Sequence, residues 1–315
     1  MRQIRSKVIA FAVLLVVGFA PVRWARAQES EAQPSGKSAG AGWLWLEQFS
    51  GSANSEGQVM ALSSTGGYNF NSRAGLFAGL PVYFIHNSSS AAGTSSADGI
   101  GDVFFGLRLS FPSQILNYRT TMVGTGPTGD AAKGLSTGHP TFDWSNHFDH
   151  RFGRWTPFAN LGLANSVPDT LYYQRAYVSY GYLAHFQAGT TVKLFRPLSA
   201  AFSGYYIDPW GSQVVTSRLV PAGATGVPGL PPGLPGLLGA LANQPTAFEE
   251  EHITTGNANL TRDYGASAGF DVNIASLFEI WIGDNYSVPL NLNTVSFGIA
   301  ANMRNFFGRS NNSGN

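Results

Sequence analysis

The stretch Asp263–Asn273, DYGASAGFDVN, alternates between two kinds of side chain along its whole length. Tyr264, Phe270 and other apolar residues fall on one set of positions, whereas Asp263, Asp271 and small or polar residues fall on the other. Successive side chains of a β-strand point to opposite faces, so this segment predicts a strand with one apolar and one polar face. Such a strand suits a sheet that separates an apolar medium from a polar one.

Two further stretches show the same alternation, at Gly101–Phe111 and Thr294–Arg304. From Trp43 onward we find no convincing 3.6-residue period, so the chain is predicted to be all-β. We expect about twelve strands, within a range of roughly 10 to 14. Their expected positions are 42–49, 58–70, 74–86, 100–111, 118–128, 139–152, 155–166, 179–194, 199–210, 262–273, 277–287 and 294–306.

Short and long connections alternate between these expected strands. The short ones lie at 71–73, 112–117, 151–154, 195–198 and 274–276, and the long ones at 87–99, 129–138, 167–174 and 211–260. This rhythm is typical of a transmembrane antiparallel β-barrel with short periplasmic turns and long extracellular loops. Closure is expected because a lipid-exposed sheet edge would leave backbone groups without hydrogen-bond partners.

The composition of the 315 residues supports this fold class. Charged residues make up only 12 % and aromatic residues 13 %, and the chain contains 38 glycines and no cysteine. The missing cysteines exclude disulfide bonds and thiolate metal sites. A helical membrane protein would need several apolar runs of about 20 residues, which the chain lacks. Aromatic residues near strand ends are expected to form girdles at the membrane interfaces; they are Trp43, Trp45, Trp144, Trp155, Tyr205, Tyr206, Trp210 and Trp281.

The N-terminus predicts a cleaved secretory signal peptide. A basic start with Arg2 and Arg5 precedes the apolar run Val8–Ala20, and Ala25-Arg-Ala27 offers a cleavage site. Cleavage leaves a net charge of −4, because the signal holds five of the 19 basic residues and none of the 18 acidic ones. That charge gives no basis for nucleic-acid binding. We expect export to the outer membrane of a Gram-negative-type bacterium, with outer-membrane lipid and, during biogenesis, the barrel-assembly machinery as partners.

We divide the chain into a signal peptide at 1–27, a flexible periplasmic leader at 28–42, the barrel at 43–307 and a polar C-terminal tail at 308–315. Within the barrel, 211–260 is expected to be a long Pro/Gly-rich extracellular loop, since proline cannot donate to a strand ladder. This loop either captures apolar solutes at the entrance or is inert, and the sequence leaves both interpretations open.

The polar faces of the strands supply the candidate functional residues. If these faces point inward, they line a lumen and lower the barrier to passage of a small solute. The candidate lining residues are Arg108, Asp143, His147, His185, Lys193, Asp263, Asp271 and Arg304. We therefore expect a channel for passive passage of a small-molecule solute. No cofactor is expected, because the glycine pattern at 124–129 lacks the helix that a dinucleotide site requires after it. No metal is expected either, since the acidic stretch Glu249–His252 is interpreted as a solvated loop rather than a site for a divalent cation.

Two other classes of function stay open. Ser145 and His147 share a strand face with Asp143 and Asp149, so a Ser–His–acid hydrolase inside the barrel is one alternative. A polar lumen wall gives the same pattern without catalysis, and no oxyanion hole is defined, so we expect a protein that is not an enzyme. A structural or adhesive barrel with a plugged lumen is the other alternative.

A pair of motifs carries a resemblance to a known family. GIGDVFFGLR at 99–108 is followed, after a short hairpin, by GTGPTGD at 124–130 and AAKGLSTG at 131–138. With GGYNFNSRAGLFAGLP at 66–81, they resemble the family of outer-membrane transporters named for the phenol meta-cleavage degradation pathway. The resemblance implies a barrel that carries small, often aromatic, compounds, although the 211–260 insertion departs from the family. The motif loop consists of Gly126, Pro127, Thr128, Gly129 and Asp130.

Overall fold

The computed structural model describes residues 41–55, 57–87, 98–169, 173–219, 252–254, 262–274 and 278–302. Several predicted segments lie outside the described residues: the signal peptide at 1–27, nearly all of the leader at 28–42, most of the 211–260 loop and the tail at 308–315. Arg304 also lies outside them. No helix in the described ranges combines the length and the apolar character that crossing a bilayer requires.

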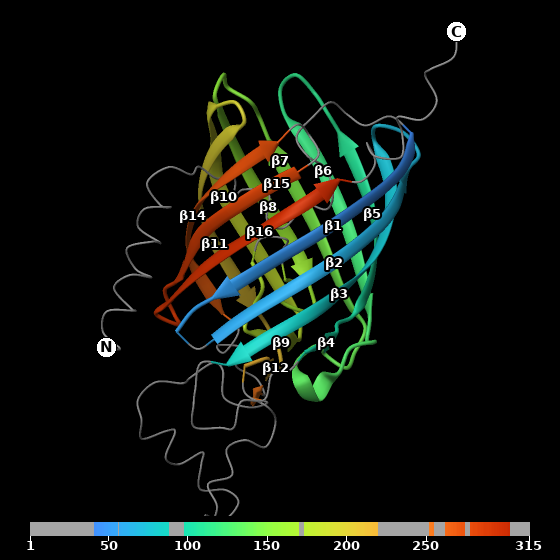
Figure 1. Ribbon diagram of the computed structural model, residues 1–315, viewed down its shortest axis with the longest axis vertical. Helices are drawn as coiled ribbons and strands as arrows, with labels where there is room; N and C mark the ends of the chain where they lie inside the picture. Colours follow the sequence, from blue (N-terminus) through green and yellow to red (C-terminus); the bar gives the residue numbers. More distant parts are fainter. Residues whose placement is uncertain are drawn as a thin grey trace, which may run out of the picture.

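Twelve antiparallel strands form one closed barrel (Figure 1). They are β1 (Gly42–Ala53), β2 (Gly57–Asn69), β3 (Ala74–Asn87), β5 (Val103–Phe111), β6 (Asn117–Gly126), β7 (Thr141–Asp149), β8 (Trp155–Ala164), β10 (Leu183–Phe195), β11 (Leu198–Pro209), β14 (Asp263–Ile274), β15 (Phe278–Ser287) and β16 (Leu292–Asn302). Each strand pairs with the next, and β1 pairs with β16 from Leu46↔Asn302 to Ala53↔Val295, which closes the ring. The predicted fold class is confirmed.

The two faces of the wall differ as the alternation predicts. On the outer face Phe105 is 62 % exposed and Met122 54 %, whereas on the inner face Asp271 and Ser296 are 0 % exposed. An apolar outer band and a polar interior are the arrangement of membrane barrels, in which lipid-facing and lumen-facing residues alternate. The alternation therefore directs the polar side chains of each strand into the interior of the barrel.

Two of the aromatic residues expected at the membrane interfaces point inward instead. Trp281 is only 3 % exposed, and the Tyr205 hydroxyl donates to Asp263 Oδ1 at 3.2 Å. Trp281 pairs across the ladder with Gly298, where an added Cβ would lie 2.1 Å from the indole Cζ2. The glycine therefore makes the space that an inward indole needs. Trp43 does face outward and is 77 % exposed.

The connections differ between the two ends of the barrel. At the turn end, which we define by the connections at 70–73, 112–116, 150–154 and 196–197, the described links are short. At the opposite, loop end lie the long connections at 127–140, 165–182 and 210–262, but also the short links at 54–56 and 288–291. The prediction of long loops at one end therefore holds for only part of that end.

Four small elements lie outside the twelve-strand ring. They are β4 (Gly99–Ile100), which pairs with β3, and β9 (Tyr177–Tyr180), β12 (Gln213–Ser217) and β13 (His252–Thr254), which form a separate three-stranded sheet. The predicted strand at 179–194 is wrong at its start, because β10 begins at Leu183 and residues 177–180 pair with β12. Gly181 separates the two strands with φ 148, a backbone conformation that glycine adopts readily.

Placing an arginine on the outer face tests whether that face contacts lipid. We expect Met122→Arg, in the middle of β6, to lower the free energy of unfolding in lipid vesicles by about 2–4 kcal/mol, because a charge at mid-bilayer is poorly solvated. Ile115→Arg, in a turn at an 84 % exposed position, is the matched control and should cost about 0–1 kcal/mol. Urea titration of the folded protein in vesicles measures both. Equal costs would contradict a membrane-embedded outer face.

Candidate functional site

A segment of the chain leaves the wall and crosses the lumen at the loop end. This crossing segment, residues 165–182 with 170–172 outside the description, joins β8 to β10. Its Asp169 Oδ2 accepts from the Tyr83 hydroxyl on β3 at 2.7 Å, and its Arg175 Nη1 lies 3.5 Å from Asp263 Oδ2 on β14. Since β3 and β14 are five strands apart in the ring, the segment bridges widely separated parts of the wall.

A third attachment holds the crossing segment to β1. The backbone N–H of Gln174 donates to Ser52 Oγ at 2.8 Å, and its side-chain Nε2 donates to Ser50 Oγ at 2.9 Å. All three residues are buried. The small serine side chains on the inner face of β1 thus act as acceptors for a segment that lies more than a hundred residues away in sequence.

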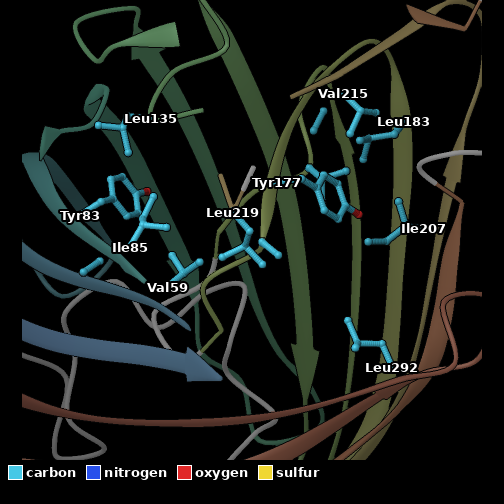
Figure 2. Close-up of a cluster of buried hydrophobic side chains, with 14 residues drawn as sticks. Val59, Tyr83, Ile85, Leu135, Tyr177, Leu183, Ile207, Val215, Leu219 and Leu292 are labelled. Carbon is cyan, nitrogen blue, oxygen red and sulfur yellow. The ribbon is translucent and has the colours of Figure 1, made fainter. Parts of the chain in front are cut away.

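Three segments lie inside the barrel at the loop end: residues 134–137, the crossing segment and residues 213–219; together we call them the insertion. Apolar side chains fill the space between these inserted segments and the wall (Figure 2). From the inserted segments come Leu135, Val167, Tyr177, Val215 and Leu219, and from the wall come Val59, Ile85, Leu183, Ile207 and Leu292. Burying a Leu, Val or Ile side chain contributes about 1.5–3 kcal/mol, so this cluster is a large part of what holds the insertion in place. It makes the loop end apolar at its centre, although the rest of the interior is polar.

Arg218 joins the inserted segments to one another. Its Nη1 lies 2.7 Å from Asp169 Oδ2 and also donates to the Arg175 carbonyl at 2.9 Å, while its Nε donates to the Gly134 carbonyl at 2.9 Å. The guanidinium carbon lies 4.5 Å from the centre of the Tyr83 ring. Burial is the largest single effect and would lower the pKa of Arg218, but the Asp169 carboxylate and the Tyr83 hydroxyl together outweigh it and raise the pKa. The guanidinium therefore stays charged and paired.

The motif loop is built around contacts between the two halves of the motif. Thr128 Oγ1 accepts from the Val103 N–H at 2.9 Å and donates to the Gly101 carbonyl at 3.0 Å. The Gly129 N–H donates to Asp102 Oδ1 at 3.0 Å. These contacts join the two halves of the motif, since each half supplies an acceptor for a donor of the other.

The end of the motif loop and the residues that follow it lead the chain into the barrel interior. Asp130 Oδ1 accepts from the Ala132 N–H and caps η1 (Ala131–Lys133), and Gly134 follows with φ 64, a left-handed conformation. A side chain at Gly134 would also collide with the backbone of Ser217, 2.6 Å from the position of its Cβ. The chain therefore turns tightly at Gly134, and the Gly134 carbonyl accepts from Arg218 Nε.

A cavity of about 230 Å³ lies inside the barrel, beneath the insertion. Its wall is formed by β1, β2, β3, β5, β6 and β7, and its remaining side by the inserted segments. The ionisable lining residues are Asp102, Asp143, Asp169 and Arg218; hydroxyl groups come from Ser50, Ser63, Thr65, Thr121, Ser145 and others; and apolar contacts come from Leu46, Phe104 and Val123. The cavity is the candidate functional site, because it combines apolar and hydrogen-bonding surface inside the fold.

The predicted lining residues lie in different parts of the interior. Asp143 lines the cavity, and His185 Nε2 lies 3.1 Å from its Oδ2, so these two residues come together. Asp263 holds the crossing segment through Arg175 and accepts from the Ser287 hydroxyl at 2.6 Å. It therefore anchors the insertion.

The other predicted residues lie away from the cavity lining. Arg108 is buried, and its Nη2 donates to Asn69 Oδ1 at 2.8 Å. Asp271 is fully buried and accepts from Asn273 Nδ2 at 2.8 Å. Lys193 is half-buried near the turn end, so these side chains are not gathered into one site.

The geometry around Ser145 and His147 does not form a nucleophile–base pair. The Ser145 hydroxyl donates to Asp143, whereas the ring nitrogens of His147 contact Asn160 Oδ1 at 2.5 Å and Asp149 Oδ2 at 3.0 Å. A hydrolase would need the imidazole to receive the serine proton. The arrangement instead resembles a hydrogen-bonded inner wall. In the described ranges, no three His, Cys, Asp or Glu side chains are grouped in a way that could hold a metal ion.

Sequence reasoning missed the residues that hold the insertion. Asp169, Arg175 and Arg218 lie in connections, where charged residues are ordinarily solvated, and no periodicity distinguishes them. Arg218 directly follows the short strand β12, but the sequence does not show that this strand pairs with β9. Only the fold brings the three residues together.

The barrel is similar to solved outer-membrane proteins. The crystal structure of the COG4313 outer membrane channel from Pseudomonas putida F1 matches with a TM-score of 0.53 and 12 % identity, over 86 % of this chain and 100 % of that one. The NanC porin matches with a TM-score of 0.41 and 6 % identity, over 82 % and 98 %. No protein-family model matches the chain, and a search of curated proteins finds no match. The first of these structures shows that the fold is shared.

Removing one charge from the buried ion pair tests how the insertion is held. Asp169→Asn leaves the Arg218 guanidinium buried without its counter-charge, which should destabilise the docked crossing segment by about 3 kcal/mol. Amide hydrogen exchange at Gln174–Tyr180 should accelerate accordingly. Asp208→Asn is the matched control, because Asp208 pairs with Arg262 at 3.2 Å with both side chains nearly half exposed. It should change the same amides by less than about 1 kcal/mol, and equal effects would contradict the anchoring role.

Proposed function

We propose that this protein is an outer-membrane channel for the passive passage of a small aromatic or hydrophobic solute. The observation that carries the proposal is the cavity, which lies inside a closed barrel whose outer face is apolar and whose inner face is polar. A wall of this kind replaces lipid with hydrogen-bonding surface along the path of the solute and so lowers the barrier to crossing. The aromatic character of the solute follows from the family resemblance.

The proposal includes the location and the partners. Residues 1–27 would direct export and be removed, and the barrel-assembly machinery would insert the mature chain into outer-membrane lipid. The outer face supports this, since exposed apolar side chains such as Phe105 and Met122 alternate with buried polar ones. Nucleic acid is not an expected partner, and the proposed role is not enzymatic.

Passage through the loop end requires the crossing segment to move. Side-chain contacts hold its middle part to the barrel wall: Gln174 to Ser50 and Ser52, Arg175 to Asp263, and Asp169 to Tyr83. The segment is therefore proposed as the gate. An element held by such contacts can have two arrangements that differ by a few kcal/mol, which is what gating needs.

The apolar cluster at the loop end supports a second candidate function. A packed centre formed by residues such as Val167, Tyr177 and Leu219 would suit a structural or adhesive barrel whose lumen stays sealed. The two candidates differ in one measurable respect: the channel requires the crossing segment to open, whereas a structural barrel functions with the segment permanently docked.

Locking the crossing segment with a disulfide distinguishes these candidates. The double variant Ser52→Cys with Gln174→Cys joins two positions at which the Gln174 backbone N–H lies 2.8 Å from Ser52 Oγ, in a chain without native cysteine. In liposomes, the reduced variant should take up small neutral solutes, and oxidation should abolish uptake, because the segment can no longer leave the lumen. Ser52→Cys alone should show the same uptake under reducing and oxidising conditions. Absence of uptake in the wild type and in both states of the variant would remove the channel and favour the sealed barrel.

A further inference from the structure

One wall of the cavity presents neighbouring polar groups on β6 and β7. The strand register places Thr121 opposite Ser145 and Val123 opposite Asp143, and all four residues line the cavity. The Ser145 hydroxyl donates to Asp143, which fixes the carboxylate against the wall. The result is a compact patch in which hydroxyl and carboxylate oxygens face the same space.

Thr121 within this patch has an unused hydrogen-bonding group. The residue is only 4 % exposed, and its Oγ1 has no hydrogen-bond partner in the described structure. Buried polar groups in folded proteins are nearly always paired, with protein, water or ligand. A hydroxyl can both donate and accept, so Thr121 offers a contact to any polar group that enters the cavity.

The charges that line the cavity are unequal in sign. Three carboxylates, on Asp102, Asp143 and Asp169, face one guanidinium, on Arg218. Asp169 is compensated by its 2.7 Å contact with Arg218, and the imidazole of His185 lies 3.1 Å from Asp143. Among the described residues no cation forms an ion pair with Asp102. The lining therefore favours hydrogen-bond donors and cations and disfavours anions.

The size and the apolar lining limit what can occupy the cavity. A cavity of about 150 Å³ lined by apolar side chains is large enough for benzene. At about 230 Å³, this cavity accommodates one six-membered ring with a short polar arm. Leu46, Phe104 and Val123 supply apolar contacts for the ring. The polar patch on β6 and β7 can then receive the arm.

We propose that this cavity is the solute-binding site of the channel and that it selects single-ring solutes bearing an amine or a hydroxyl group over those bearing a carboxylate. Thr121 contacts the polar arm through its free hydroxyl, and the Asp143 and Asp102 carboxylates accept from it. The assignment of this site to transport rests on the proposed function. Binding itself can be measured without transport, so the two ideas can fail separately.

Three probes of equal ring size but different charge test the selectivity. The full mature chain in lipid nanodiscs is titrated calorimetrically with cyclohexylmethylamine, cyclohexylmethanol and cyclohexanecarboxylate, and empty nanodiscs correct for partition into lipid. The measurement is made at about pH 8, where an ordinary imidazole is neutral. The amine and the alcohol should bind. The carboxylate should bind more weakly by roughly tenfold or more, because like charges repel in a desolvated site.

Matched variants assign the binding to the polar patch. Thr121→Val keeps the side-chain shape but removes the hydroxyl, and should weaken alcohol binding by roughly threefold to tenfold. Ser296→Ala is the control, because Ser296 on β16 is also fully buried with an unpaired hydroxyl but does not line the cavity. It should leave binding unchanged. Asp143→Asn should weaken binding of the amine and reduce the discrimination against the carboxylate, because the arm then meets a neutral amide. Heat-modifiable gel migration checks that each variant is folded.

The outcomes separate this inference from the proposed function. Equal affinity for the three probes, or equal losses in Thr121→Val and Ser296→Ala, would overturn the binding site. Uptake by liposomes without any probe preference would retain the channel and overturn the inference. Binding with the expected preference, but no uptake under any condition, would support the site and remove the channel.

Discussion

The pairing of β1 with β16 is the interaction on which the rest of the structure depends, because it removes the last free edge of the sheet. In hydrocarbon, a backbone N–H or C=O without a partner is strongly unfavourable, and a closed ring is the arrangement in which every strand has two neighbours. Closure also defines an inside. Once the ring is complete, alternation along each strand sends half of the side chains to a space that lipid cannot reach, and polar residues such as Ser296 and Asp271 become compatible with a membrane.

The enclosed space is filled by different kinds of side chain at the loop end and in the rest of the interior. At the loop end, an apolar cluster and a small number of buried ion pairs hold the crossing segment, with Asp169 and Arg218 joining parts of the chain that lie far apart in sequence. A buried charge is tolerated only when its partner and its hydrogen bonds are present, and Arg218 has a carboxylate, two carbonyl groups and the Tyr83 ring around it. This arrangement is specific, because each of these contacts depends on the position of the crossing segment inside the ring.

Beneath the insertion, the inner faces of six strands supply most of the side chains that line the cavity. Hydroxyl groups from β6 and β7 and the carboxylates of Asp102 and Asp143 stand beside Leu46 and Phe104, so the same wall can contact a ring and its polar substituent. Gly79 contributes to this shape, because an added Cβ there would lie 2.4 Å from the Cζ atom of Phe104. The proposed solute preference would therefore come from side chains that the barrel orients.

From the sequence alone, alternation predicted an all-β chain of about twelve strands, with Phe105 on the apolar face and Asp263 on the polar face, because alternation is a local property that most strands carry. The sequence also identified both halves of the motif, and the structure shows that hydrogen bonds of Thr128 and Asp102 join them. The tertiary structure alone decided that residues 177–180 leave the barrel to pair with β12, that Trp281 turns inward over Gly298, and that Asp169, Arg175 and Arg218 meet in the lumen. These features depend on which residues become neighbours across the ring, and connections carry no periodicity from which such neighbours could be read.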